Sequence, residues 1–242
     1  MAVKISLCEK IPKNAVIIEA FPSKGYVSSI ASSYLIKEAG FRQIGSVECA
    51  ELANFVVVHD GEIQRPIRFY GKDDIVIIFS EIIIPPALVE EFVEEFEKWI
   101  LEVGPREIIM LTSLLDAENE EEHKIMGVAT TPELKMRLKD LGVEPLMEGV
   151  LTGLSSTMIL DCAEHKVPAT TLIVRTKYVP DALAAASLLN VLEKMIGVKV
   201  DVKKLRETGR VFERQFQSLL EQLKKNEQEP PIGKIEDEVM YR

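Results

Sequence analysis

The sequence predicts an α/β protein with a single three-layer domain, in which helices cover both faces of a mixed, mostly parallel sheet. Short apolar runs rich in β-branched residues, such as 75–79 and 169–174, are too apolar for strands with one solvated face. These runs alternate with amphipathic segments of helical period, which implies right-handed crossovers between parallel strands. We expect this domain to span residues 1–225 and a flexible C-terminal arm to follow over residues 226–242.

In the N-terminal half, turn residues divide the chain into elements. Gly40 ends the first helix, and Asp60-Gly61 is a hairpin signal that adds antiparallel strands to the sheet. Pro85-Pro86 opens a long helix with one apolar stripe and a glutamate-rich face. Residues 1–13 form an irregular or edge segment in this prediction. The strands that follow are expected at 15–20, 46–51, 55–59, 67–70 and 75–79, and the helices at 26–39 and 85–103.

In the C-terminal half, the same signals predict a further series of strands and helices. Thr131 caps a short helix, and Gly149 and Gly153 precede a helix whose apolar residues recur on one face and which Pro168 stops. Composition changes at Asn226, after which the chain carries too little apolar surface to fold. Strands are expected at 107–111, 125–129 and 169–174, and helices at 131–141, 154–167, 181–196 and 201–225.

The order of several segments carries a resemblance to a known family. Thr152-Gly153-Leu154 precedes a buried run, and Pro180-Asp181 and three consecutive alanines from Ala184 open the next helix. Together with the strand, Phe-Pro-x-x-Gly turn and helix at residues 16–36, this order resembles the family of the second proteasome assembly chaperone and its archaeal homologues. The resemblance covers roughly residues 14–206.

What the resemblance implies is a non-enzymatic protein that associates with the proteasome core particle. Archaeal members of the family form closed rings, so we expect a homo-oligomeric ring. The resemblance alone suggests a pentamer. Assembly chaperones of this kind work in pairs, so a second partner chain is an open alternative. The resemblance does not distinguish assembly of the core particle from its activation.

Met240, Tyr241 and Arg242 form a hydrophobic-Tyr-X sequence at the end of the expected arm. It resembles the C-terminal motif through which proteasome activators and some assembly chaperones dock on the α-ring of the core particle. An apolar side chain, an aromatic ring with a hydroxyl and a free carboxylate could enter a pocket and pair there with a lysine. The motif could also be incidental, or latent if the arm is buried in its own oligomer.

The alternative function is a ligand- or nucleotide-binding α/β module, or an enzyme, with its site near the Lys24 turn. There a strand meets a helix, so backbone N–H groups could hold an anion with Lys24, Gly25 and Ser28 in reach. The turn lacks the Gly-x-x-x-x-Gly-Lys-Ser/Thr pattern of a phosphate loop. The simpler interpretation is that Gly25 only allows the turn to close.

Composition argues against several partners. A formal net charge of −10 disfavours nucleic acid and anionic membranes, which attract Lys and Arg. Three widely spaced cysteines provide neither a disulfide framework nor a Cys-x-x-Cys metal site, and they fit a reducing cytoplasm. No apolar run reaches the roughly 18 residues of a membrane span.

The sequence also shows no recognisable catalytic constellation. Ser155 lacks the glycine that a nucleophile elbow needs two positions later, and the acidic run at 116–123 lacks the spacing of a calcium loop. Glu51, Asp60 and Asp161 are isolated carboxylates in the sequence, with no partner for acid–base work. We therefore expect no catalytic residue, no metal and no cofactor.

Overall fold

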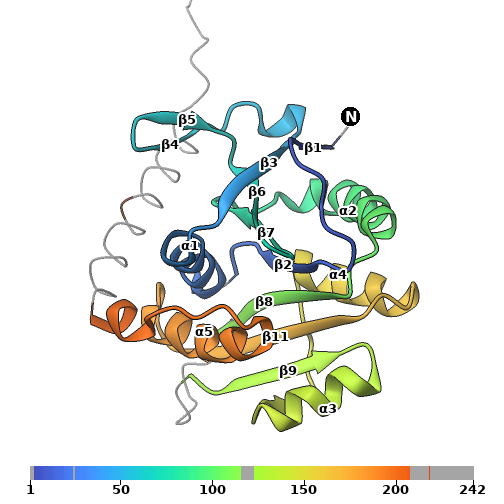
Figure 1. Cartoon of the computed structure of the whole chain (residues 1–242), viewed down its shortest axis with the longest axis vertical. Coiled ribbons are helices and arrows are strands. Elements are labelled where there is room, and N and C mark those ends of the chain that lie inside the picture. The colour runs from blue at the N-terminus through green and yellow to red at the C-terminus, as the bar shows by residue number, and fades with distance from the viewer. Residues whose placement is uncertain (1–2, 24, 116–122, 208–217, 219–242) are drawn as a thin grey trace, which may run out of the picture.

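The computed structural model describes residues 3–23, 25–115, 123–207 and 218 of the 242-residue chain. A nine-stranded mixed sheet lies between two layers of helices, which confirms the predicted α/β class (Figure 1). Its strands are β1 (Lys4–Leu7), β2 (Val16–Ala20), β3 (Arg42–Glu48), β6 (Ile67–Lys72), β7 (Ile75–Ser80), β8 (Glu107–Leu115), β9 (Ile125–Ala129), β10 (Glu144–Pro145) and β11 (Ala169–Thr176).

The sheet has a parallel centre and antiparallel flanks, in the order β1-β3-β6-β7-β2-β8-β11-β9-β10. The strands β7, β2, β8 and β11 are mutually parallel. On one side β6, β3 and β1 continue antiparallel, and on the other β9 runs antiparallel to β11 and carries the short parallel strand β10. Four of these eight pairings are parallel, and three of the four lie side by side at the centre.

Helices cover both faces of the sheet in the described part of the chain. On one face lie α1 (Val27–Ala39) and α5 (Ala182–Ile196), and on the other lie α2 (Val89–Val103) and α4 (Leu154–Glu164) (Figure 1). Successive strand residues point to opposite faces, so Ile18 of β2 packs with α1 and α5 while Ile17 packs with α2 and α4. This double coverage explains why the central strands are apolar at almost every position. The shorter helix α3 (Pro132–Asp140) packs against β9 and β10.

The predicted helix boundaries correspond to local capping groups. Gly40 and Gly104 end α1 and α2 with φ angles of 70° and 60°, which only glycine adopts without strain. The Thr131 hydroxyl begins α3 by accepting a hydrogen bond from the Leu134 N–H at 3.3 Å. None of the described helices combines the length and hydrophobicity needed to span a bilayer.

The structure differs from the prediction between residues 46 and 70. The strand expected at 46–51 lies earlier, as β3, and a short 3-10 helix, η1 (Ala50–Leu52), follows it. The Asp60-Gly61 hairpin forms, but its strands β4 (Val57–His59) and β5 (Glu62–Gln64) make a separate two-stranded sheet. Pro66 has no N–H with which to continue the hydrogen-bond ladder between β4 and β5. Its carbonyl accepts a hydrogen bond from the Glu81 N–H at 3.1 Å, and from here the chain pairs with β7 as β6.

Helix α4 ends at Glu164 rather than at Pro168, because Lys166 has a φ angle of 59° and leaves the helical conformation first.

Other expectations fall partly or wholly outside the described residues. Of the helix expected at 201–225, residues 202–207 are described and helical. Lys24, the acidic run at 116–122 and the arm at 226–242 lie outside the described part of the chain.

Candidate functional site

The turn that carries Gly25 lies at the carboxyl ends of the parallel strands, the edge where open α/β sheets commonly bind ligands. Gly25 has a φ angle of 90°, and a Cβ atom there would lie 3.0 Å from Cγ2 of Thr176. Ser28 is fully buried, and its hydroxyl donates to the Phe21 carbonyl at 2.7 Å. The turn is therefore packed closely against the end of β11, and glycine is needed there for conformational and steric reasons.

These contacts bear on the predicted anion site at Lys24, Gly25 and Ser28. Because the Ser28 hydroxyl is directed to a backbone carbonyl of its own turn, the geometry favours the turn-closing interpretation of Gly25. The neighbouring Ser23 hydroxyl lies 2.8 Å from that of Ser113, which links the turn to β8. The anion site stays a prediction, since Lys24 is outside the described residues.

A second hydrogen-bonded group at the same edge centres on Asp181, which is 3% exposed. Its carboxylate accepts from the Ala184 N–H at 2.9 Å, which caps α5, and from the Thr176 hydroxyl at 2.7 Å. His123 Nε2 lies 3.1 Å from the same carboxylate. Asp181 was expected to begin this helix, but its contacts with Thr176 and His123 were not predicted.

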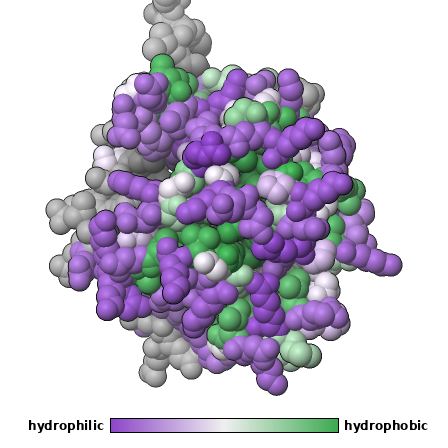
Figure 2. Space-filling view, viewed as in Figure 1, coloured by the Kyte–Doolittle hydropathy of each residue, from purple (hydrophilic) through white to green (hydrophobic). Residues whose placement is uncertain are grey.

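Exposed apolar side chains surround this edge of the sheet. They come from the end of β8, the loop after β11 and the first turn of α5, and they are Leu114, Leu115, Tyr178, Val179 and Leu183. On the face drawn in Figure 2, hydrophobic residues also form a patch within a largely hydrophilic surface. Exposed apolar side chains gathered in one region are typical of an interaction surface.

Glu19 is a carboxyl group that the sequence analysis did not single out. It lies on the central strand β2 and is fully buried. Its Oε1 accepts from the Phe21 N–H at 2.9 Å, while its Oε2 has no hydrogen bond of ordinary geometry to any described residue. Burial raises the pKa of Glu19 to about 7, although the Ser155 hydroxyl and the Phe21 N–H act to lower it. The only sequence signal is one carboxylate in an otherwise apolar strand.

A buried ion pair joins the β4–β5 hairpin to the main sheet. Arg68 on β6 is 1% exposed and donates to the carboxylate of Glu81, which is 4% exposed. From the hairpin, His59 Nε2 lies 2.7 Å from the same Glu81 oxygen, and Gln64 accepts from Arg68. The Arg68 guanidinium also lies 5.7 Å from the ring centroid of Tyr70. These groups fix the hairpin to β6 and β7.

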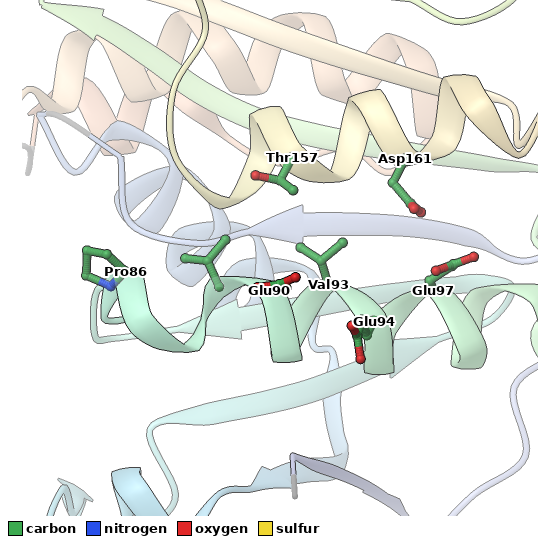
Figure 3. A pocket seen from close by; sticks show the side chains of 8 residues that line it. Pro86, Glu90, Val93, Glu94, Glu97, Thr157 and Asp161 are labelled. Carbon is green, nitrogen blue, oxygen red and sulfur yellow. The ribbon is translucent and has the colours of Figure 1, made fainter. Parts of the chain in front are cut away.

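A groove of about 510 Å³ runs between α2 and α4 (Figure 3). The side chains of Glu97 and Asp161 face each other across it. Beside these two carboxylates, His165 Nε2 lies 3.1 Å from Glu97 Oε1, and His165 Nδ1 lies 3.3 Å from Asp161 Oδ1. The residues that line the groove are Pro86, Val89, Glu90, Val93, Glu94, Glu97, Thr157 and Asp161.

The expectation that Asp161 is an isolated carboxylate is therefore wrong. Two helices bring Glu97 and His165 to it, and burial raises the pKa of Asp161 with the negative charge of Glu97 adding to the effect. The four-residue spacing of Asp161 and His165 at the end of α4 could have revealed half of the group, because side chains four residues apart share a helix face. Nothing in the sequence placed Glu97 beside them.

The family can now be assigned by comparison. A family model described as the PAC2 family matches residues 17–220. The chain belongs to the PAC2 family. Its curated relatives include the uncharacterized protein MJ0106 of Methanocaldococcus jannaschii, which is 30% identical over 211 residues, or 87% of each chain.

Two solved structures extend the comparison for this PAC2 protein. Pyrococcus furiosus PbaA, described as an archaeal homolog of proteasome-assembly chaperone, superimposes with a TM-score of 0.85 at 29% identity, over 93% of this chain and 99% of PbaA. Pyrococcus furiosus PbaB, described as an archaeal proteasome activator, gives a TM-score of 0.74 at 20% identity, over 90% and 98% of the two chains. The second match shows a shared fold. The resemblance seen in the sequence is thus confirmed at the level of the family.

Proposed function

We propose that this PAC2 protein is a non-enzymatic, proteasome-associated protein of the cytoplasm. In this proposal it forms a homo-oligomeric ring and docks on the α-ring of the proteasome core particle, or on a related partner, through its C-terminal tails. The observation that carries the proposal is the fold match to PbaA, with a TM-score of 0.85 across 99% of that chain. PbaA is described as a homolog of a proteasome-assembly chaperone.

The described geometry supports an interaction protein more than an enzyme. At the carboxyl edge of the parallel strands, Ser28 and Asp181 make hydrogen bonds within the domain. Apolar side chains such as Tyr178 and Val179 are exposed around them, at 59% and 50% of their surface. Apolar surface of this kind is typical of protein contacts, whereas substrate chemistry needs polar groups that point into a pocket.

The tail supplies the docking element of the proposal. Met240, Tyr241 and Arg242 match the hydrophobic-Tyr-X pattern. A tripeptide buries few side chains, and ordering the arm before it costs entropy, so one tail alone binds weakly. A ring that presents several tails at once gains about 10²-fold or more in avidity when all can reach their pockets. Ring formation and tail docking therefore belong to one mechanism.

Deletion of Met240–Arg242 is expected to abolish binding to purified proteasome core particles. The Tyr241→Ala variant is expected to weaken binding at least about tenfold, because a buried tyrosine is a frequent hot spot of an interface. Surface plasmon resonance with immobilised core particles measures both effects.

The matched control is Glu236→Gln, a substitution in the same arm that leaves the last three residues intact. It is expected to bind as the unchanged protein does. Equal binding of the full-length and truncated proteins would contradict tail docking while leaving the family assignment untouched. Binding by neither would direct the search to a second partner chain, and peptide-hydrolysis assays with the binding protein would separate activation from assembly.

The oligomer is tested separately. Size-exclusion chromatography with light scattering is expected to give a mass about five times that of the 27.2 kDa chain. The truncated protein should give the same mass, since the tail docks outward in this proposal. A monomer at all concentrations tested would contradict the ring.

A further inference from the structure

We propose that Glu97, Asp161 and His165 form a binding site for a zinc-class divalent cation at one end of the groove between α2 and α4. One donor atom from each of the three residues lies within 4.8 Å of the other two. The proposal is independent of the proteasome, because none of its residues belongs to the tail or to the carboxyl edge of the parallel strands. It also goes against our expectation from sequence that the protein holds no metal.

The separation of the donor atoms suits one ion. In a tetrahedral zinc site with ligand bonds of about 2.1 Å, neighbouring donor atoms are roughly 3.4 Å apart. His165 Nε2 already lies 3.1 Å from Glu97 Oε1. Asp161 extends into the same space from α4 and faces Glu97 (Figure 3). Asp161 Oδ1 lies 3.3 Å from His165 Nδ1, so its carboxylate would have to turn toward Nε2 to bind the same ion.

The imidazole of His165 is held in a suitable orientation. Its Nδ1 lies 3.1 Å from the backbone carbonyl oxygen of Asp161, one turn earlier in α4. A histidine that donates its Nδ1–H to a carbonyl presents the Nε2 lone pair to a metal, and such partners are usual for metal-binding histidines. Nε2 is the atom that faces Glu97.

Packed helices fix the positions of the three ligands. Asp161 lies on α4, whose residues Met158 and Cys162 are buried in the core, and His165 directly follows this helix as its C-cap. Glu97 follows Phe96 on α2, and Phe96 is buried in the same core cluster. Binding therefore does not require a loop to become ordered, which lowers the entropic cost of forming the site.

The ligand set and the groove determine the kind of cation. An imidazole with two carboxylates suits Zn²⁺ and related transition metals, whereas Ca²⁺ and Mg²⁺ favour all-oxygen shells. Glu97 and Asp161 both line the groove, so a fourth position would open into it, as in zinc sites that keep a water ligand. Glu90 and Glu94 line the same groove and add negative charge that attracts a cation.

The test is titration of the full-length, chelator-treated protein with Co²⁺ and Zn²⁺. A Cys8→Ser background removes the exposed thiol, which could bind these ions by itself. We expect about one Co²⁺ per chain with visible absorption of a tetrahedral site, displacement by Zn²⁺, and no displacement by Mg²⁺ or Ca²⁺. Isothermal titration calorimetry gives the affinity for Zn²⁺.

Two variants and one control decide the site. His165→Gln and Asp161→Asn are each expected to lose at least about tenfold in affinity for Zn²⁺, because each removes a ligand. Glu90→Gln lies in the same groove but is no proposed ligand, so its affinity should stay close to that of the parent protein. Circular dichroism monitors folding of all three. Absence of Zn²⁺ binding, or equal binding by His165→Gln and the parent, would overturn the proposal.

Discussion

Glu19→Gln is expected to raise the free energy of unfolding at pH 8 by about 3 kcal/mol. In the unchanged protein the free energy of unfolding should decrease between pH 4.5 and 7, and the variant should lose much of this decrease. Burial raises the pKa of Glu19 from 4.5 to about 7 in the folded protein. Between these values the unfolded chain has released its proton while the native protein still holds it. Stability therefore falls as the pH rises through this window, and glutamine carries no proton to lose.

Urea unfolding of the two proteins at pH 5 and at pH 8 measures this effect. The control is Glu148→Gln, in which an exposed carboxylate is removed and the two curves should be nearly unchanged. The explanation fails if Glu19→Gln and the unchanged protein lose the same stability between the two pH values. In that case the Glu19 carboxyl group would be solvated by other means in the folded state.

Glu81→Gln is expected to lower the free energy of unfolding by about 3–5 kcal/mol. The substitution leaves the guanidinium of Arg68, which is 1% exposed, without its counter-charge in the protein interior. It also weakens the contact with His59, which fixes the β4–β5 hairpin to the sheet. Thermal and urea unfolding measure the loss.

The double variant Arg68→Met/Glu81→Leu separates the charge from the packing. Apolar side chains of similar size need no counter-charge, so the double variant should be more stable than Glu81→Gln alone. Comparison with the two single replacements gives a coupling energy in a double-mutant cycle. Additive losses would show that Arg68 and Glu81 do not stabilise each other.

Most of the fold could be predicted because the central strands are apolar on both faces and glycines mark the helix ends. Runs such as β7 can be placed only between two helical layers, and Gly40 and Gly104 end their helices where expected. The short edge strand β10 has two residues, too few for a periodic pattern. The hairpin was misassigned because pairing partners across a sheet are chosen by tertiary contacts, such as that of Pro66 with Glu81.

The candidate sites were less predictable because they are assembled in three dimensions. The sequence located the Gly25 turn and the start of α5 at Asp181, since turn and capping residues act on their own neighbours. It could not bring Glu97 to His165, because that contact depends on how α2 packs against α4. Nor could it show that Glu19 is fully buried, since burial of one residue depends on both helical layers.

The position of β2 in the sheet has a consequence for how the chain folds. Its neighbours are β7 and β8, which follow much later in the sequence, and both pairings are parallel. Such pairings form slowly, because long segments must be closed into loops before any contact is gained. During synthesis, β2 leaves the ribosome long before β8 is available to cover its second edge. Until then one edge of β2 is unpaired, and unpaired strand edges with exposed apolar side chains favour aggregation of a partly folded chain.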